Sequence, residues 1–133
     1  MCQLKKARAI KKMQKRSKKD ILGDIKTKYF ATAKRHIFVC TGSKCVKDNL
    51  GEELYQVLKK KLHQIQPDKS TAEVHRSKST CLGVCAHGPL ALVYPEGILY
   101  FELKIEDLDK LIEEHLLHGR PVSSLSFFRM PSL

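Results

Sequence analysis

Four of the five cysteines occur as two closely spaced pairs, which makes them the residues best suited to do chemistry in this chain. Cys40 and Cys45 have the spacing C-x4-C, and Cys81 and Cys85 have the spacing C-x3-C. Thiols at such spacings can form disulfides, work as a redox dithiol or bind a metal. Each pair supplies only half of a four-ligand site, so the chemistry depends on whether the fold brings the two pairs together.

The spacings and the number of cysteines bear differently on these uses. A redox dithiol more typically has the spacing C-x2-C at the start of a helix, which neither pair shows. Five cysteines are an odd number, which suits a secreted disulfide framework poorly. Structural zinc prefers tight C-x2-C knuckles but tolerates wider spacings, so zinc stays open as an alternative. Four thiolates on two loops are also the ligands that a [2Fe–2S] cluster needs, two on each iron.

Two other iron–sulfur patterns do not match the sequence. The plant-type ferredoxin spacing C-x4-C-x2-C fails because residue 48 is Asp. A Rieske centre needs two histidines with two cysteines, and the four thiols already complete the coordination. His87, two residues after Cys85, is therefore interpreted as a neighbour of the site or a surface residue. Cys2 lies far from the pairs and is expected to be an exposed free thiol.

The secondary structure predicted around the cysteines places both pairs at one edge of a sheet. The apolar run HIFVC at 36–40 predicts a buried strand, and residues 72–79 predict a second strand. A helix joins them, and a strand–helix–strand unit favours a parallel pair with a right-handed crossover. Both cysteine loops then leave the same sheet edge, where open α/β sheets usually bind ligands. Each loop also holds a glycine, which lets backbone N–H groups approach a cluster.

The remaining elements complete a small α/β domain. Asp48 can cap the connecting helix and Pro67 ends it, and six apolar residues are expected on its inward face: Leu50, Leu54, Val57, Leu58, Leu62 and Ile65. Residues 90–95 and 98–103 predict a hairpin with a turn at 96–97. A last helix is expected from 105 to 118, ended by Gly119. This order predicts a small mixed four-stranded sheet flanked by helices, in a thioredoxin-like layout.

The C-x4-C pair, the helix after it and the stretch CLGVCAHGPLALVYPEGILYF resemble the thioredoxin-like [2Fe–2S] ferredoxins. They are also similar to the related domain in the small flavoprotein-associated subunit of NADH:quinone oxidoreductases and hydrogenases, although that subunit normally carries a helical bundle before this domain. The resemblance covers residues 36–125. It implies Cys40, Cys45, Cys81 and Cys85 as ligands of one [2Fe–2S] cluster, one-electron transfer and often a homodimer.

The formal net charge of +11 is concentrated at the N-terminus. Residues 1–35, called the basic arm below, hold 13 Lys/Arg against Asp20 and Asp24, whereas residues 36–133 hold 12 Lys/Arg against 12 Asp/Glu. We therefore expect a basic, partly helical extension at 1–35, a thioredoxin-like [2Fe–2S] ferredoxin domain at 36–125 and a C-terminal tail at 126–133. The arm is not part of the family pattern.

These observations favour a one-electron carrier that docks to redox partner proteins and is not an enzyme. No Ser/His/Asp set, carboxylate pair or phosphate-binding glycine loop indicates catalysis. The alternative is an accessory or redox-sensing interaction protein, in which the arm binds an acidic partner and the cluster is regulatory or structural. An acidic protein surface is the preferred partner of the arm, because charge raises encounter rates. Nucleic acid and an anionic membrane are less favoured. Against specific nucleic-acid recognition, the arm lacks interleaved aromatic residues before Tyr29 and the folded part has no basic surplus.

Two further features bear on location. The chain has no apolar run long enough to cross a bilayer, and its start lacks the charged, apolar and small-residue regions of a signal peptide. We therefore expect a soluble, cytoplasmic protein.

Overall fold

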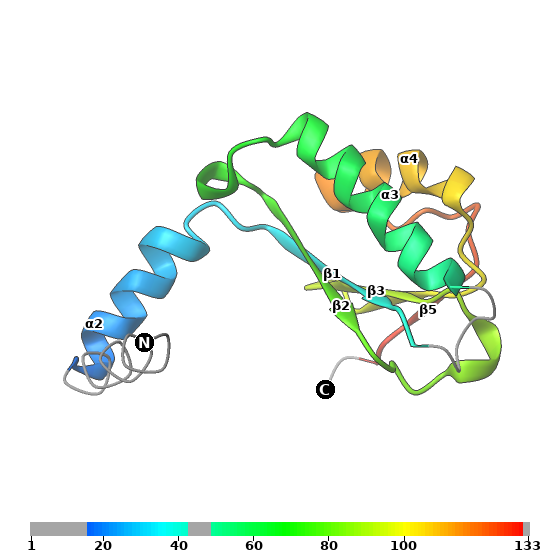
Figure 1. The fold of residues 1–133 in the computed structure, drawn as a ribbon, viewed down its shortest axis with the longest axis horizontal. Coiled ribbons are helices and arrows are strands. Elements are labelled where there is room, and N and C mark those ends of the chain that lie inside the picture. The colour runs from blue at the N-terminus through cyan, green and yellow to red at the C-terminus, as the bar shows by residue number, and fades with distance from the viewer. Residues whose placement is uncertain (1–15, 43–48, 132–133) are drawn as a thin grey trace, which may run out of the picture. The chain divides into compact units, whose positions relative to one another are not determined.

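The computed structural model describes residues 16–42 and 49–131, shown in Figure 1. The chain divides into two compact units, Met1–Ala31 and Thr32–Leu133. The second unit holds the sheet and the helices that pack on it. No helix within the described stretches is long and apolar enough to cross a membrane.

The second unit is built on one mixed sheet with the strand order β2-β1-β3-β4-β5. The strands are β1 (Arg35–Cys40), β2 (Val74–Ser79), β3 (Ala91–Tyr94), β4 (Ile98–Tyr100) and β5 (Phe127–Arg129). β1 and β2 are parallel, as expected for a strand–helix–strand unit, and the other three pairs are antiparallel. The predicted α/β class and the parallel first pair are thus confirmed.

Within the described residues the sheet has five strands, so the predicted count of four was wrong. The extra strand, β5, comes from the segment expected to be a C-terminal tail and pairs antiparallel with β4. Two adjacent phenylalanines between serines and an arginine are too short a run to show strand alternation. Phe127 packs against the core with its ring centroid 5.8 Å from that of Tyr100, whereas Phe128 is 54% exposed.

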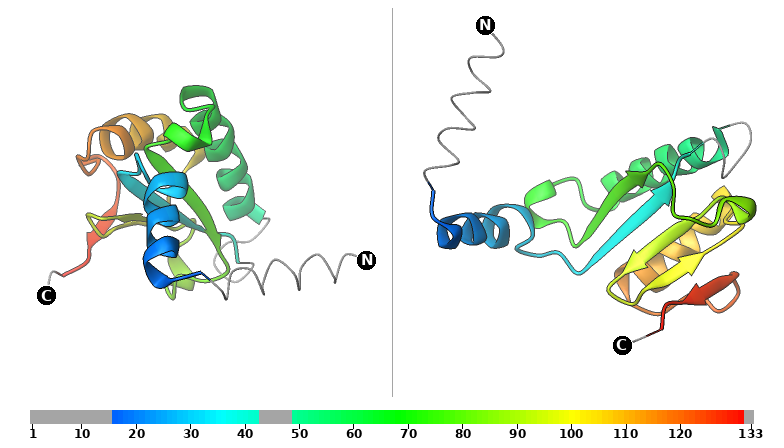
Figure 2. Two further views of the ribbon diagram at one scale, coloured as in Figure 1. Left: turned by 90° about the vertical axis from the view of Figure 1, so that its left-hand side faces the viewer. Right: turned by 90° about the horizontal axis from the view of Figure 1, so that it is seen from below.

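Two helical segments cover one face of the sheet (Figures 1 and 2). The first is α3 (Leu50–Ile65), and the second runs from Ile105 to Leu117 as a 3-10 turn (Ile105–Asp107), α4 (Leu108–Lys110) and a π-helical end (Leu111–Leu117). Gly119 follows the second segment with φ +76°, a left-handed conformation that suits glycine at a helix end. Both predicted helices are present.

The inward face of α3 was predicted too broadly. Leu54, Leu58 and Leu62 are buried, but Leu50 and Ile65, the first and last residues of the helix, are 43% and 52% exposed. Asn49, in a left-handed conformation with φ 57°, occupies the N-cap position and makes no side-chain cap hydrogen bond. The predicted cap, Asp48, lies outside the described residues.

A buried polar network ties β1, the β3–β4 turn and the last helix together. His115 is fully buried, with Nδ1 2.7 Å from the Tyr100 hydroxyl and Nε2 2.8 Å from the Glu96 carboxylate. The Tyr100 oxygen accepts from the Val122 N–H at 3.1 Å, and Glu96 accepts from Arg35 Nε at 2.7 Å. These partners suit a neutral His115 that carries its proton on Nε2.

No helix of the second unit's described residues covers the other face of the sheet, which we call the helix-free face. Ile37 and Val39 point into the main core, so Phe38 and Cys40 alternate onto the helix-free face. A second apolar cluster lies there and comprises Cys40, Leu90 and Leu99, with Leu82, Leu92, Phe101 and Met130 packed against them.

Candidate functional site

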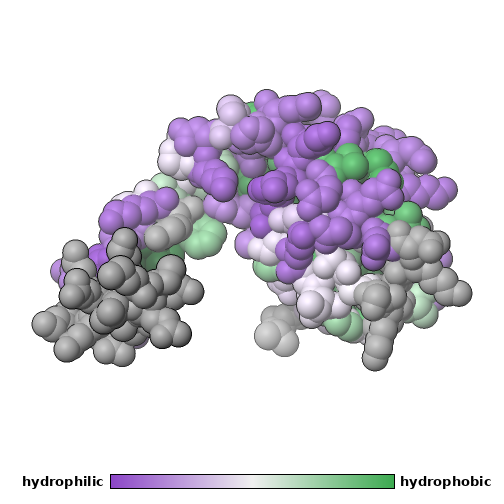
Figure 3. All heavy atoms as spheres, in the orientation of Figure 1, coloured by the Kyte–Doolittle hydropathy of each residue, from purple (hydrophilic) through white to green (hydrophobic). Residues whose placement is uncertain are grey.

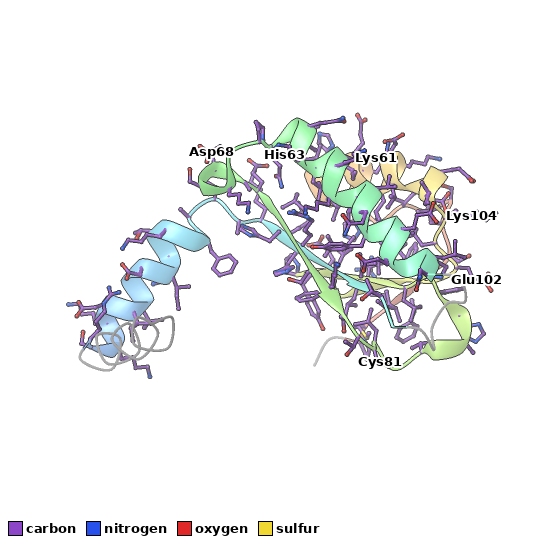
Figure 4. The ribbon with its side chains drawn as sticks, in the orientation of Figure 1. Lys61, His63, Asp68, Cys81, Glu102 and Lys104 are labelled. Carbon is purple, nitrogen blue, oxygen red and sulfur yellow. The ribbon has the colours of Figure 1, made fainter. Side chains whose placement is uncertain are left out.

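The parallel pairing of β1 with β2 brings two of the predicted ligand positions to one edge of the sheet. Cys40, the last residue of β1, is paired with Ser79, the last residue of β2. Cys81 follows two residues later, and Figure 4 shows it beyond the end of β2. The Thr41 N–H donates to the Ser79 carbonyl at 2.8 Å, which continues the pairing past the strand ends. The prediction that both loops leave the same edge is confirmed for their first cysteines.

The second cysteine of each pair is less completely described. Cys45 belongs to residues 43–48, which lie outside the described residues. Cys85 begins a 3-10 turn, Cys85–His87, but its side chain is likewise outside the described set. Among the described side chains, no group of three or more His, Cys, Asp or Glu is placed to hold a metal. The four-cysteine ligand set therefore stays a prediction.

Cys40 is fully buried on the helix-free face. Its N–H donates to the Leu90 carbonyl at 3.0 Å, which links β1 to the start of the hairpin. Its Sγ lies 4.0 Å from the Thr80 carbonyl oxygen, in the loop that carries Cys81. The apolar residues around Cys40 would shield a group bound to its sulfur from water on that side.

Two glycines let the backbone close tightly around Cys40. A Cβ on Gly42 would clash with the Thr80 carbonyl oxygen, and a Cβ on Gly51 would clash with the Cys40 carbonyl oxygen. Because both obstacles are backbone atoms, only glycine fits at these positions. Gly42 thus lets the two cysteine loops meet backbone to backbone, and Gly51 brings the start of α3 against the end of β1.

The loop that carries Cys81 is shaped around the cysteine sulfur. Cys81 is exposed, and the N–H of Gly83 donates to its Sγ at 3.3 Å. Gly83 has φ +86°, a left-handed conformation open to glycine at little cost. The Ser79 hydroxyl donates to the Cys81 carbonyl at 3.1 Å and fixes the start of the loop. A backbone N–H aimed at a cysteine sulfur stabilises its thiolate, the form that binds metals.

Glu102 and Leu103, which follow β4, hydrogen-bond to the C-terminal end of the loop that carries Cys81. The Glu102 N–H donates to the His87 carbonyl at 2.9 Å, and the Leu103 N–H donates to the Pro89 carbonyl at 3.1 Å. Glu102 itself has φ 50°. These bonds position residues 85–89, including the turn that begins at Cys85. The sequence alone gave no signal for these contacts, because they join backbone groups whose residue types are ordinary.

An apolar hollow opens beside the same loop. Its lining is Val84, His87, Leu99, Phe101 and Phe128. His87 is thus placed on the rim of an apolar surface next to the cysteine loop. The sequence did not predict this hollow, because Phe128 reaches it only through the unexpected strand β5.

Comparison with known proteins decides the family. Residues 27–116 match the family model described as thioredoxin-like [2Fe-2S] ferredoxin. The chain belongs to this family. Its members are named ferredoxins, which are electron-transfer proteins and not enzymes, and their cofactor is a [2Fe–2S] cluster.

Several relatives support the same conclusion. A 2Fe–2S ferredoxin from Clostridium pasteurianum is 28% identical over 69% of this chain and 94% of its own length. A 2Fe–2S ferredoxin from Aquifex aeolicus is 31% identical over 68% of this chain and 86% of its own length. The solved structure of the wild-type thioredoxin-like ferredoxin from Aquifex aeolicus has a TM-score of 0.59 at 28% identity, over 75% of this chain and 99% of that one. Structures of two of its cysteine-to-serine variants, at positions four apart, are similar as well.

The described residues fit the cofactor of the family. The Cys40 sulfur is buried among apolar side chains, and the Cys81 sulfur accepts a backbone N–H at the surface. The close contact of Gly42 with the Thr80 carbonyl keeps the two loops together. Thiolates on two adjoining loops with backbone donors around them are the environment in which [2Fe–2S] clusters are held.

Proposed function

We propose that this chain is a one-electron carrier whose single [2Fe–2S] cluster is held by Cys40, Cys45, Cys81 and Cys85. The observation that carries the proposal is the β1–β2 register, which pairs Cys40 at the end of β1 with Ser79, two residues before Cys81. The cysteine-to-serine positions in the two Aquifex variants are four apart, the spacing of Cys81 and Cys85. That agreement supports the second pair as ligands.

Cys40 and Cys81 would bind the cofactor from two different sides, one buried and one exposed. A bound [2Fe–2S] cluster supplies a reversible one-electron couple. Cys40 would hold it from the buried side, where Leu90 and Leu99 exclude water. Cys81 would hold it from the exposed side, where Gly83 donates a hydrogen bond to the sulfur and stabilises negative charge on it. An electron would enter and leave across the exposed loop 80–89, onto which a redox partner protein would dock.

Alanine variants of single cysteines test the ligand set. We expect Cys81→Ala and Cys85→Ala to lose most of the bound iron and acid-labile sulfide, because an alanine side chain has no atom that can bind iron. Cys2→Ala is the matched control and should retain both in full. Iron and sulfide are measured per chain after anaerobic purification. A Cys81→Ala protein with the full content of both would remove Cys81 from the ligand set.

A second copy of the chain is proposed to cover part of the helix-free face. Tyr94 is 46% exposed and lies on this face against the Phe38 ring, with the ring centroids 6.2 Å apart. Phe128 is 54% exposed and lies on the same face opposite Leu99. Apolar sheet surface of this kind is typical of a face that packs against another chain. Sedimentation equilibrium should find a dimer that Phe128→Lys weakens, and a monomer at all accessible concentrations would contradict this.

We propose that the basic arm binds electrostatically to an anionic surface near the redox partner. It carries 13 Lys/Arg against two Asp, so its attraction to such a surface should weaken steeply with salt. Deletion of residues 1–34 should remove the salt-dependent binding while the visible spectrum of the cluster stays unchanged. If the truncated protein still bound the anionic surface at every salt concentration, the binding would belong to the folded unit and not to the arm.

A further inference from the structure

The basic arm contains a defined helical segment, residues 17–30, and not merely a run of charges. α2 (Lys18–Asp24) continues into the π-helical turn η1 (Ile25–Tyr29). Ser17 begins the helix with a capping box, because its hydroxyl accepts from the Asp20 N–H at 3.2 Å and its own N–H donates to the Asp20 carboxylate at 3.4 Å. Because the segment is helical, each side chain can be assigned to one side of the helix.

One side of this segment presents apolar side chains to solvent. Ile21, Leu22 and Ile25 are 38%, 46% and 41% exposed, and no residue of α2 is buried. Their spacing of i, i+1 and i+4 places them on one side of a helix. Phe30, at the end of the segment, is 48% exposed. Figure 3 shows hydrophobic side chains beside hydrophilic ones on this unit.

The other side chains of the segment leave a cationic surface. Both carboxylates are occupied within the helix: Asp20 closes the capping box, and Asp24 pairs with Arg16 and, at 3.1 Å, with Lys28. Lys18, Lys19 and Lys26 are exposed and have no carboxylate partner among the described residues. Ten of the 13 cations in the arm are lysines, whose long flexible stems carry a point charge without a fixed partner geometry.

We infer that segment 17–30 lies in the interface of an anionic lipid bilayer, with Ile21, Leu22 and Ile25 toward the acyl chains and the lysines at the headgroup phosphates. The inference rests on the proposed anionic target of the arm and is independent of the cluster ligands. A short amphipathic helix rich in lysine, in which Asp24 is paired with cations and Asp20 is used in the capping box, matches the charge and the apolarity of that interface. Nucleic acid or an acidic protein patch would match the charge but leave the apolar row in water.

A single tryptophan can report where this side of the helix lies. The chain contains no tryptophan, so Leu22→Trp provides the only indole signal in the full-length protein. With vesicles of phosphatidylcholine and phosphatidylserine, we expect its emission to shift to the blue and to be quenched by brominated acyl chains. Thr27→Trp is the matched control, because Thr27 is exposed on the polar side and is also uncharged. Its emission should change far less.

A charge-preserving variant separates insertion from simple attraction. Ile21→Gln combined with Ile25→Gln should weaken binding to phosphatidylserine vesicles about tenfold or more, since it removes the apolar contact and no charge. Vesicles of phosphatidylcholine alone should bind neither protein. Equal affinity of the variant and the wild type, equal quenching of the two tryptophans, or no binding to anionic vesicles would each overturn the inference. An unchanged iron and sulfide content in these variants keeps such a failure distinct from a failure of the cluster assignment.

Discussion

At the scale of single residues, glycines shape the backbone around both described cysteines, Cys40 and Cys81. Gly42 and Gly83 both lie next to predicted ligands, but for different physical reasons. Gly42 is packed against a backbone carbonyl, whereas a Cβ on Gly83 would meet no atom within 4 Å and only the positive φ opposes it. A substitution at Gly42 therefore tests the close contact between the two loops, whereas a substitution at Gly83 tests only the left-handed backbone conformation.

Alanine at these two glycines should have unequal effects. Gly42→Ala would push the Thr80 carbonyl away and open the two cysteine loops, so we expect a loss of most bound iron. Gly83→Ala adds only the cost of a left-handed alanine, about 1–2 kcal/mol, and should retain most of the iron. Iron per chain after identical anaerobic purification measures the difference. Equal iron content in the two variants would mean that the close approach at Gly42 does not hold the site.

His115 should make the free energy of unfolding depend on pH. It belongs to the polar network at the Arg35 end of β1, away from Cys40. Burial lowers the pKa of His115 below its ordinary 6.5, although the hydrogen bond to Glu96 opposes this. Burial also acts to raise the pKa of Glu96, but the hydrogen bonds from Arg35 and His115 outweigh it, so that pKa lies below 4.5. Native His115 is therefore neutral at a pH where the unfolded chain already binds a proton at this position.

The free energy of unfolding should consequently fall as the pH is lowered from 6.5 toward the native pKa of His115. Each unit of that pKa difference corresponds to about 1.4 kcal/mol. A second loss should follow below pH 4.5 as Glu96 is protonated. Denaturant unfolding across this range measures the slope, and His115→Gln should show a smaller slope between pH 6.5 and 4.5. The same slope in both proteins would show that His115 does not titrate on unfolding.

At the scale of elements, how much could be predicted from sequence depended on the length of the apolar runs. The runs at 36–40 and 90–103 and the periodic helices 50–65 and 105–118 carry clear signals, and all four appear in the structure. β5 has only three residues and gains its partner from β4, so no local pattern shows it. The hydrogen bonds that hold loop 85–89 are equally invisible, because they join backbone groups distant in sequence. The strand–helix–strand order predicted that both cysteine loops leave one sheet edge, because parallel strands leave little freedom in where their ends lie.

The two phenylalanines of β5 should differ in their effect on stability. Phe127 packs against the main core and contacts the Tyr100 ring, so Phe127→Ala should lower the free energy of unfolding by about 2–3 kcal/mol. Phe128 is more than half exposed, and Phe128→Ala should cost less than about 1 kcal/mol. Thermal or denaturant unfolding of each variant checks the order. A larger loss for Phe128→Ala would contradict the packing of β5 described above.

At the scale of the whole molecule, two units with different chemistry share one chain. Thr32–Leu133 carries the sheet, the cysteine loops and the helix-free face, and its charges balance closely. Met1–Ala31 carries most of the positive surplus and a helix with exposed apolar side chains. Family membership accounts for most of Thr32–Leu133, because the match covers residues 27–116 and the basic segment before residue 27 lies outside it. The proposed electron transfer and the proposed membrane binding can therefore be tested separately by truncation.

A reductive titration of anaerobically purified, full-length protein, with metal analysis of the same sample, tests the proposed cluster most directly. We expect a coloured protein with iron and acid-labile sulfide in equal amounts, about two of each per chain. It should take up about one electron per chain and then give a paramagnetic signal. A colourless protein that contains only zinc on its cysteines, or one that takes up no electron, would contradict the proposed cluster.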